Sequence, residues 1–342
     1  MKYLNTICTV TAVVTFAFLA ALPANAENIK VTPLGSHEGE FCYKDRALIL
    51  EDPDGTRILY DPGRTVVGAK DSRLGKIDVV LVTHMHGDHV GNEHISDFKL
   101  KPGNCDGEPK MVNDLPNTNA VNIAIAKDAL IVTGSEMYKF FAAKLKAHGG
   151  KEENSLPVGF GASRKVGGVT ITTVPAVHPN GVDWGMIEGL GKQEVIVKGK
   201  VEKVELVKLL SAAGLTAYVG PATGYVLIFS NGLAVYLSGD TGITAEQDTV
   251  VRQYYGAKLV VMNIGDKYTT GPNEAAWVIN ELIKPVSVIA SHANEAATKK
   301  GKVIPGTKTD SFIKATKNAL VLVPLSGTTM EFDGVGNCVA GC

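Results

Sequence analysis

Short apolar runs, bounded by glycine, proline, asparagine or aspartate, recur along the chain from residue 47 onward. Runs of about four to seven such residues are typical of β-strands, several of them buried on both faces. Between two of the runs, Asn231-Gly232 predicts a tight hairpin turn, because both residues tolerate the positive φ that a short connection needs. The predicted strands span residues 47–50, 57–60, 77–82, 129–132, 169–174, 225–229, 233–237, 258–263, 286–290 and 320–323.

Helical periodicity appears between these runs. After the cap-like stretch 271–274, one helical face would carry the apolar residues Ala275, Val278, Ile279, Leu282 and Ile283. Similar faces occur at residues 135–147, 201–213, 245–255 and 309–317. Because strands and helices alternate, the pattern predicts an α/β or α+β fold whose sheets are covered by helices.

No linker or change in composition divides residues 27–342, which predicts a single domain. Two polar segments, 95–122 and 185–218, interrupt the alternation of strands and helices. We interpret both as insertions, because segments of that length usually cover or shape a site.

The first 26 residues differ from the rest. Lys2 is followed by an uncharged apolar run from Ile7 to Leu22 and then by Ala24-Asn25-Ala26. This order predicts a secretory signal peptide that is removed before Glu27. A membrane anchor is the alternative, but the run is short for a hydrocarbon layer about 30 Å thick. We therefore expect a secreted or periplasmic protein without a stable membrane anchor.

The composition is that of a globular protein with a full core, since 45% of the 342 residues are hydrophobic and 20% are charged. The formal net charge is −1, and no run of lysine or arginine is longer than Lys299-Lys300. Such a sequence lacks the cluster of positive charge that binding to a nucleic acid or an anionic membrane would need. We expect a small-molecule substrate and no nucleic-acid partner, and the oligomeric state stays open.

Export would place the four cysteines of the mature chain in an oxidising compartment, where thiols pair. Four cysteines allow three pairings. Cys338 and Cys342 are separated only by Val-Ala-Gly, which favours a local terminal loop. That pairing leaves Cys42 to form a disulfide with Cys105.

The sequence Thr-His-Met-His-Gly-Asp-His of residues 83–89 holds three of the eight histidines of the chain. It follows the predicted strand 77–82, so His84, His86, Asp88 and His89 lie just beyond the carboxyl end of a strand, where α/β sheets place ligand sites. Imidazole and carboxylate groups are ligands of zinc and similar ions, and the HxHxDH pattern is far more specific than isolated histidines. The motif therefore predicts a metal site.

Three further ligand-type residues also follow predicted strands. They are His178 in Ala-Val-His-Pro, Asp240 in Ser-Gly-Asp-Thr-Gly, and His292 in Ala-Ser-His-Ala. Because each lies at the end of a strand, all three could meet the motif at one edge of the sheets.

This series of motifs resembles the metallo-β-lactamase fold hydrolases over most of residues 29–325. The stretches 265–272 and 222–225 look like the branch that includes L-ascorbate-6-phosphate lactonase. The resemblance implies a four-layer αββα sandwich with metals between the sheet edges. It assigns His84, His86 and His178 to a first metal ion, Asp88, His89 and His292 to a second, and Asp240 to a bridging position.

Seven ligands for two ions leave open coordination positions, which favours a catalytic site over a closed structural one. We expect two Zn²⁺ ions, with Mn²⁺ or Fe²⁺ as alternatives because the same donors bind all three. Two close cations would share and acidify a water, which gives a bridging hydroxide, while one of them polarises the substrate oxygen. Asp88 would orient that hydroxide or pass a proton, and Tyr268 or Thr269 would donate to the substrate oxyanion, although a core tyrosine is an equal alternative for Tyr268.

Three other positions bear on the site. By analogy with the family, Asp61 would accept a hydrogen bond from a ligand imidazole, with an Asp-Pro turn as the alternative. His37 lies where relatives often have a glycine-histidine, but its Ser-His-Glu-Gly context departs from that pattern, so its role stays open. We expect His94 and His148 to be exposed and outside the site.

The sequence thus predicts an exported metal-dependent hydrolase that cleaves a small ester, a lactone or a phosphorylated molecule. Asp240 argues against a true β-lactamase, because those enzymes usually have another residue in its place. A single-iron oxygenase on the same scaffold and a non-catalytic periplasmic metal-binding protein are the two alternatives.

Overall fold

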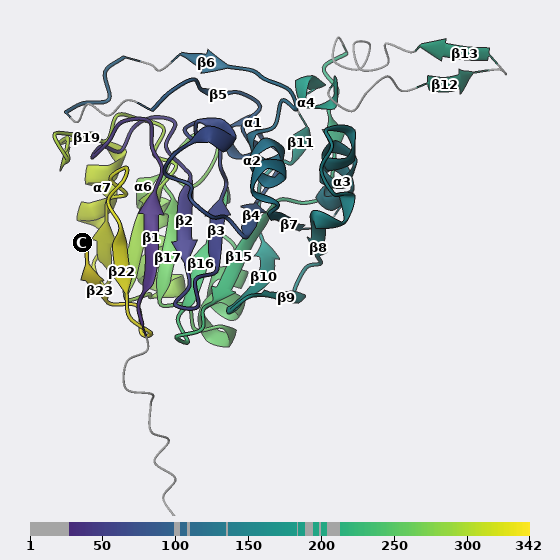
Figure 1. Cartoon of the computed structure of the whole chain (residues 1–342). Coiled ribbons are helices and arrows are strands. Elements are labelled where there is room, and N and C mark those ends of the chain that lie inside the picture. The colour runs from purple at the N-terminus through teal and green to yellow at the C-terminus, as the bar shows by residue number, and fades with distance from the viewer. Residues whose placement is uncertain are drawn as a thin grey trace, which may run out of the picture.

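The structure, a computed structural model, describes residues 27–98, 103–107, 110–134, 136–182, 184–188, 194–197, 200–203 and 213–342. Two large sheets dominate it (Figure 1). The first has the order β23-β22-β1-β2-β3-β4-β7-β8, and the second has the order β21-β18-β17-β16-β15-β10-β9.

The first sheet consists of β1 (Ile29–Pro33), β2 (Leu48–Glu51), β3 (Arg57–Tyr60), β4 (Val79–Val82), β7 (Leu130–Gly134), β8 (Ser155–Val158), β22 (Met330–Phe332) and β23 (Cys338–Ala340). The second consists of β9 (Ser163–Val166), β10 (Val169–Pro175), β15 (Thr223–Ile228), β16 (Ala234–Leu237), β17 (Leu259–Asn263), β18 (Ser287–Ser291) and β21 (Leu320–Leu322). Two-stranded ribbons join β5 (His94–Ile95) to β6 (Met111–Val112), β11 (Gly181–Val182) to β14 (Ala217–Tyr218), β12 (Glu194–Val197) to β13 (Lys200–Lys203), and β19 (Thr298–Lys299) to β20 (Lys302–Val303).

The helices connect these strands. Their bounds are η1 (Gly68–Lys70), α1 (Gly87–Val90), α2 (Asn119–Lys127), α3 (Met137–Ala147), η2 (Glu152–Asn154), α4 (Trp184–Glu188), η3 (Gln247–Tyr254), α6 (Pro272–Trp277), η4 (Val278–Ile283) and α7 (Lys308–Ala315). The segments η1 and η2 are short 3₁₀ turns, and η3 and η4 have π-type hydrogen bonding.

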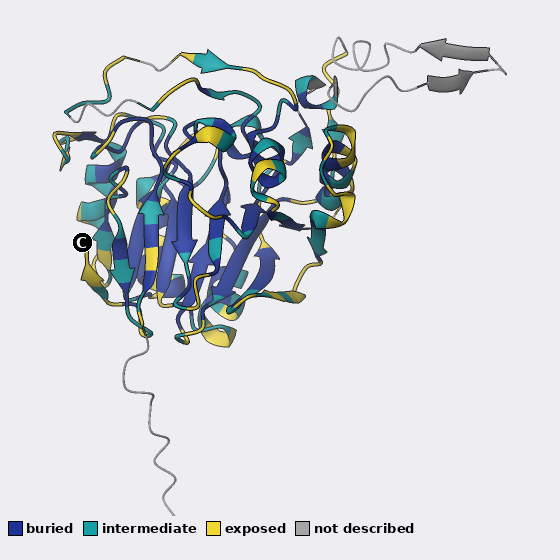
Figure 2. Ribbon diagram, in the orientation of Figure 1, coloured by how far each residue is buried: buried dark blue, intermediate teal, exposed yellow. Residues whose placement is uncertain are grey.

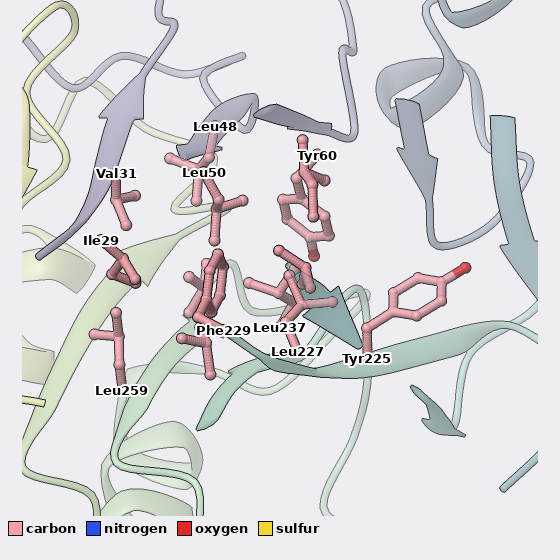
Figure 3. Close-up of a cluster of buried hydrophobic side chains, with 14 of the residues drawn as sticks. Ile29, Val31, Leu48, Leu50, Tyr60, Tyr225, Leu227, Phe229, Leu237 and Leu259 are labelled. Atoms are coloured by element: carbon pink, nitrogen blue, oxygen red, sulfur yellow. The ribbon is translucent and has the colours of Figure 1, made fainter. Parts of the chain in front are cut away.

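The inner faces of the two sheets pack on each other. Figure 3 shows Ile29, Val31 and Leu50 of the first sheet facing Leu227 and Leu259 of the second, and all five are fully buried. Removing each such side chain from water contributes about 1.5–3 kcal/mol to folding. The core between the sheets therefore contributes strongly to the stability of the sandwich.

Helices cover the outer face of each sheet, so that buried residues concentrate in the sheets while the outer sides of the helices are exposed (Figure 2). On the first sheet, Val121 of α2 and Phe141 of α3 pack against a cluster that includes Val80 and Ile131. On the second, a separate cluster joins the strands to η3, α6, η4 and α7. These layers form the four-layer αββα sandwich that the resemblance implied, and the fold class is confirmed.

Parallel strands bring the candidate ligands to one edge of the two sheets. In the first sheet β3, β4, β7 and β8 are parallel, and in the second β16, β17, β18 and β21 are parallel. Strand β10 shares the direction of β16, because both pair antiparallel with β15 between them. The carboxyl ends of β4, β10, β16 and β18 are the points where the candidate ligands begin.

Each of the ten predicted strands is present, with bounds that differ by a few residues. The predicted helix 201–213 is wrong at its start, because residues 200–203 form strand β13, and residues 204–212 lie outside the described part of the chain. The last residues of the segment 95–122 belong to α2, a helix that the sequence pattern did not predict. The predicted signal peptide, residues 1–26, also lies outside the described residues. Among the described residues, no helix has the length and apolar character needed to span a bilayer.

Candidate metal centre

The histidine motif occupies the turn between β4 and α1. His84 follows the buried strand directly, and His86 is the extended residue that precedes the first turn of α1. Asp88 and His89 lie within that turn. The turn ends at Gly91, which has a φ of 72°, and a Cβ there would come within 2.4 Å of Gly63 O. Glycine is needed at this position, and the tight turn brings all four donors to one side.

The three remaining candidates come from the second sheet. His178 lies three residues beyond Pro175, the last residue of β10, and Asp240 lies three beyond the end of β16. His292 directly follows β18 and has a φ of 51°, the left-handed conformation that costs a non-glycine residue about 1–2 kcal/mol. A strained residue in this position is typical of a functional site.

All seven predicted ligands converge. Three groups have ligand atoms within 4.8 Å of one another: His84, His86 and His178; Asp88, His89 and His292; and His84, His89 and Asp240. The first two are the two triads that the resemblance assigned to separate ions. The third contains Asp240 and one histidine from each triad, which places Asp240 between them.

Distances around Asp240 agree with this central position. Its Oδ1 lies 3.3 Å from His89 Nε2, and its Oδ2 lies 3.2 Å from His292 Nε2 and 3.6 Å from His178 Nε2. The Nε2 atom of His84 is 4.0 Å from the same Oδ2. Asp240 is therefore near both triads at once.

Several ring nitrogens at the centre are buried without a hydrogen bond. The Nε2 atoms of His84, His89 and His292 have no hydrogen-bond partner among the described residues. A buried polar atom without a partner costs about 1–3 kcal/mol, so such atoms need a ligand. Nitrogen donors from histidine together with carboxylate oxygens match the preferences of Zn²⁺, Mn²⁺ and Fe²⁺, and the residues fit a metal centre.

Hydrogen bonds behind the site fix which ring nitrogen faces inward. Asp61 Oδ2 lies 2.8 Å from His89 Nδ1 and accepts a 2.8 Å hydrogen bond from Thr83 Oγ1. Because the Thr83 hydroxyl donates to Asp61, it accepts from His84 Nδ1 at 3.0 Å. Each Nδ1 then carries a proton, and each Nε2 faces the centre, where it presents a lone pair when the ring is neutral. The contact expected of Asp61 is present, and Thr83 extends it to a second imidazole.

The surroundings favour the neutral imidazole at His84, His86 and His178, the protonated imidazole at His89, and the ionised carboxylate at Asp240. Burial lowers the pKa of His84 and of His86, and it lowers the pKa of His178 to about 4. Burial acts on His89 in the same direction, but the carboxylates of Asp240, Asp61 and Asp88 raise its pKa to about 10. Burial would raise the pKa of Asp240, whereas the nearby His89 and His292 hold it well below its usual range. The carboxylates thus attract positive charge to this point.

Sequence reasoning did not find Arg46. Its Nη2 lies 2.8 Å from Asp88 Oδ2 and donates a 2.9 Å hydrogen bond to Asn294 Oδ1. Burial would raise the pKa of Asp88, but the Arg46 guanidinium and His89 hold it below its usual range. Arg46 precedes β2, far from every motif, so nothing in the sequence indicated this contact.

A cavity of about 520 Å³ opens onto the centre and is lined by His86, Asp88, His178, Asp240 and His292, among others. Tyr268 also lines it and is 67% exposed, so the alternative of a core tyrosine is wrong. Thr269 does not belong to the lining and donates to Thr270 O at 3.3 Å.

Three histidines lie outside the centre. His37 is buried beside Ser36 Oγ and Cys42 Sγ, in a separate cavity of about 60 Å³. His94 and His148 are half-buried rather than exposed, which corrects the expectation for both. The ring of His94 packs toward Gly68, and its Nδ1 lies 2.8 Å from Ile95 O.

Both expected disulfides are present, Cys42 to Cys105 and Cys338 to Cys342. The first lies in the wall of the cavity beside His37. It connects the loop that carries Lys44 and Arg46 to the segment around residue 105.

Comparisons with known proteins agree with this geometry. Residues 56–293 match the family described as the beta-lactamase superfamily domain. A UPF0173 metal-dependent hydrolase from Koribacter versatilis is 28% identical over 243 residues, 70% of this chain and 77% of that protein. A UPF0173 metal-dependent hydrolase from Pelotomaculum thermopropionicum is 29% identical over 266 residues, 78% of this chain and 85% of that protein. Among solved structures, Igni18, a metallo hydrolase from Ignicoccus hospitalis, shares the fold with a TM-score of 0.55 and 21% identity, over 90% of this chain and 99% of that one.

Proposed function

Because the chain belongs to the beta-lactamase superfamily, we propose that it is a metal-dependent hydrolase whose seven converging side chains hold two divalent ions. The observation that carries the proposal is the pair of donor triads with Asp240 between them. The relatives described as metal-dependent hydrolases support the same class of activity.

In this proposal His84, His86 and His178 hold one ion, and Asp88, His89 and His292 hold the other. Asp240 contributes to both because its carboxylate is near histidines of each triad. We propose Zn²⁺, with Mn²⁺ or Fe²⁺ as alternatives that the same donors accept. Bound divalent ions would supply an acidified water near neutral pH and a Lewis acid for the carbonyl or phosphoryl oxygen under attack.

The protein's own groups orient the reaction. Asp61 and Thr83 keep the rings of His84 and His89 in one tautomer, as their hydrogen bonds require. Arg46 holds Asp88 in place as an ionised carboxylate, which can accept a hydrogen bond from the attacking water. That ion pair also makes Asp88 a poor proton carrier, so orientation is the better supported of its two predicted roles. Tyr268 is the lining hydroxyl proposed to donate to the substrate oxyanion.

The substrate class is a small ester, a lactone or a phosphorylated molecule. A cavity of about 520 Å³ is of the size that holds small ligands in proteins. The stretches 265–272 and 222–225 are the basis for the narrower likeness to L-ascorbate-6-phosphate lactonase.

We also propose that the protein is exported to the periplasm or the medium. The order of charge, apolar run and small residues before Glu27 supports export. The two disulfides support it independently, because such bonds persist in oxidising compartments. Cell fractionation with N-terminal sequencing of the mature protein tests this, and an intact Met1 on a cytosolic protein would contradict it.

Metal analysis combined with hydrolysis tests the proposed function. The purified protein should contain two zinc or manganese ions per chain and should cleave 4-nitrophenyl acetate, a lactone or bis(4-nitrophenyl) phosphate. One iron with oxygen uptake would identify the oxygenase alternative, and metal without turnover would identify the binding protein. Either of these results overturns the hydrolase.

His86→Ala should abolish bound metal and turnover, because it removes one donor of the first triad. The variant should stay folded, since His86 lies in a turn outside the cores of the sandwich. Metal content, turnover and circular dichroism are the measurements. His148→Ala, a change of the same kind at a residue outside the cavity lining, is the matched control and should keep both metal and activity. Retained turnover in His86→Ala would refute the mechanism.

A further inference from the structure

Positive charge surrounds the cavity above the metal centre. Four lining side chains are cationic: Lys44, Arg46, Arg64 and Lys267. Among the described residues, the only carboxylates in the lining are Asp88 and Asp240, and both belong to the donor groups of the candidate centre. If these two hold metal ions, as the proposed function requires, the described lining has no further carboxylate that could pair with Lys267.

Arg46, Arg64 and Lys267 differ in what they already contact. Arg46 is paired with Asp88 at 2.8 Å, and Arg64 lies 3.4 Å from a Glu93 carboxylate oxygen. Lys267 differs from both arginines, because no carboxylate lies within 4.0 Å of its ammonium in the described part of the chain. Its Nζ instead lies 5.2 Å from the centre of the Tyr268 ring, and both residues line the cavity.

The backbone holds Lys267 in an unfavourable conformation. Asp266 and Lys267 are consecutive non-glycine residues with φ values of 61° and 64°. Each such residue costs about 1–2 kcal/mol, and a pair persists only where the surroundings enforce it. Strain of this kind is typical of positions where a side chain must be presented to a ligand.

Hydrogen bonds attach both ends of the loop that carries Lys267, residues 265–270, to neighbouring backbone segments. Lys308 Nζ donates to Gly265 O at 2.6 Å and to Ala293 O at 2.9 Å, which joins the loop to the residue after His292. At the other end, Thr270 N donates to Thr241 O at 3.1 Å, next to Asp240. The loop that carries Lys267 is thus fixed to the same backbone segments that carry two of the candidate ligands.

We infer that the substrate carries an anionic group, a carboxylate or a phosphate, separate from the bond that is cleaved, and that Lys267 binds this group at the cavity lining. Tyr268 would pack against the part of the substrate between the anion and the scissile bond. The inference rests on the proposed function, since it names the substrate class of that site.

Matched esters test the inference. We would compare 4-nitrophenyl butyrate with 4-nitrophenyl hemisuccinate and with the 4-nitrophenyl ester of 3-phosphonopropionic acid, which share a leaving group and differ in whether a methyl, a carboxylate or a phosphonate ends the acyl chain. The metal-loaded protein should have a higher kcat/KM for at least one anionic ester, and that preference should shrink in high salt, which screens charges in contact with solvent. The better of the two anionic esters distinguishes a carboxylate from a phosphate-like group.

Lys267→Ala should raise KM for the preferred anionic ester about fivefold, the effect of one solvent-accessible ion pair. The change in KM for neutral 4-nitrophenyl butyrate should be much smaller, because that ester has no anion for Lys267 to bind, and Lys267→Arg should restore part of the affinity for the anionic ester. Lys284→Ala is the matched control, because Lys284 is also an exposed lysine with positive φ, at 53°, and does not line the cavity.

Calorimetry supplies a readout without turnover. Succinate titrated into the metal-loaded protein should bind less tightly to Lys267→Ala than to the wild type, by about the same factor as the change in KM. Equal kcat/KM for neutral and anionic esters, or equal succinate affinity in both proteins, overturns the inference while the hydrolase stands. If no ester, lactone or bis(4-nitrophenyl) phosphate is cleaved, the hydrolase proposal fails, and the titration alone still decides whether Lys267 binds an anion.

Discussion

At the scale of single residues, the centre consists of donor side chains that face its middle and of other side chains that hold those donors in place. His84, His86, Asp88 and His89 lie within six positions after a buried run, so their spacing alone brings them together. Arg46 contacts Asp88 from 42 residues earlier in the chain, and Asn294, which lies 206 residues after Asp88, accepts a hydrogen bond from Arg46. Short-range patterns contain no information on such contacts, which only the packing of the two sheets creates.

Asp61 was partly predictable from the sequence. Its place at the end of a strand and the analogy with the family indicated that it accepts a hydrogen bond from a ligand imidazole, and the structure shows its contacts with His89 and Thr83. Asp61→Asn should weaken zinc binding about 10- to 100-fold, since the amide cannot orient both donors as the carboxylate does. Competition with a chromogenic chelator measures the affinity.

Asp78→Asn is the control for this change, because Asp78 lies at the opposite end of the same pair of strands, where it accepts a hydrogen bond from Arg57 N at 2.9 Å. It should leave the zinc affinity unchanged. Equal zinc affinities of Asp61→Asn and Asp78→Asn would refute the proposed role of Asp61.

At the scale of elements, the strands were predictable because most are continuous buried runs. β4 is buried at all four positions, and β17 at all five. β1 was missed because exposed Lys30 and half-buried Thr32 alternate with its buried residues. Helix α2 was not predicted because polar residues lie near Asn119 in the sequence. Val121, Ile123 and Ala124 of that helix are nevertheless buried against the first sheet. The sequence pattern of a segment predicts which secondary structure it can form. Whether a polar segment becomes part of a sheet or a covering helix depends on how it is buried in the folded protein.

Helix α3 contains a feature that its amphipathic pattern does not explain. Lys144 is fully buried, and its Nζ donates to Pro116 O at 2.6 Å. Burial lowers the pKa of this ammonium to about 8. Below pH 8 the folded protein holds a buried charge at a cost, and this cost disappears as the pH rises from about 8 toward 10.5, where the unfolded chain also loses the proton.

Lys144→Met should therefore raise the free energy of unfolding at pH 7 by about 1–2 kcal/mol, which allows for the lost hydrogen bond. The gain should vanish at pH 10. Urea denaturation at the two pH values measures it. Lys146→Met changes an exposed neighbour that pairs with Glu152 at 3.0 Å, and it should show no such dependence on pH. A constant difference between Lys144→Met and the wild type would contradict the buried charge.

At the scale of the whole molecule, alternation of strands and helices predicted covered sheets, and the motif series predicted the αββα arrangement. The order of the strands was not predictable, because the chain returns at β22 and β23 to complete the sheet that begins with β1. Nothing in the local sequence of residues 330–340 indicates that partner, and the pairing follows from packing across the sandwich.

The two disulfides should contribute unequally to stability. Cys42–Cys105 spans 63 residues, and Cys338–Cys342 spans four. Because a crosslink removes more chain entropy from the unfolded state when it closes a longer loop, the estimates are about 4 and 2 kcal/mol. The double variant Cys42→Ser/Cys105→Ser should unfold at clearly lower urea concentration than Cys338→Ser/Cys342→Ser. Equal midpoints would refute this ranking.

The long disulfide also closes a covalent ring of backbone, residues 42–105, and His84, His86, Asp88 and His89 are inside it. A protease that nicks any single peptide bond between residues 43 and 104 would therefore separate no fragment from the molecule. The nicked protein would migrate as one species without reductant and as two with it. In surroundings rich in proteases, this ring protects the histidine motif from being released after a first cut.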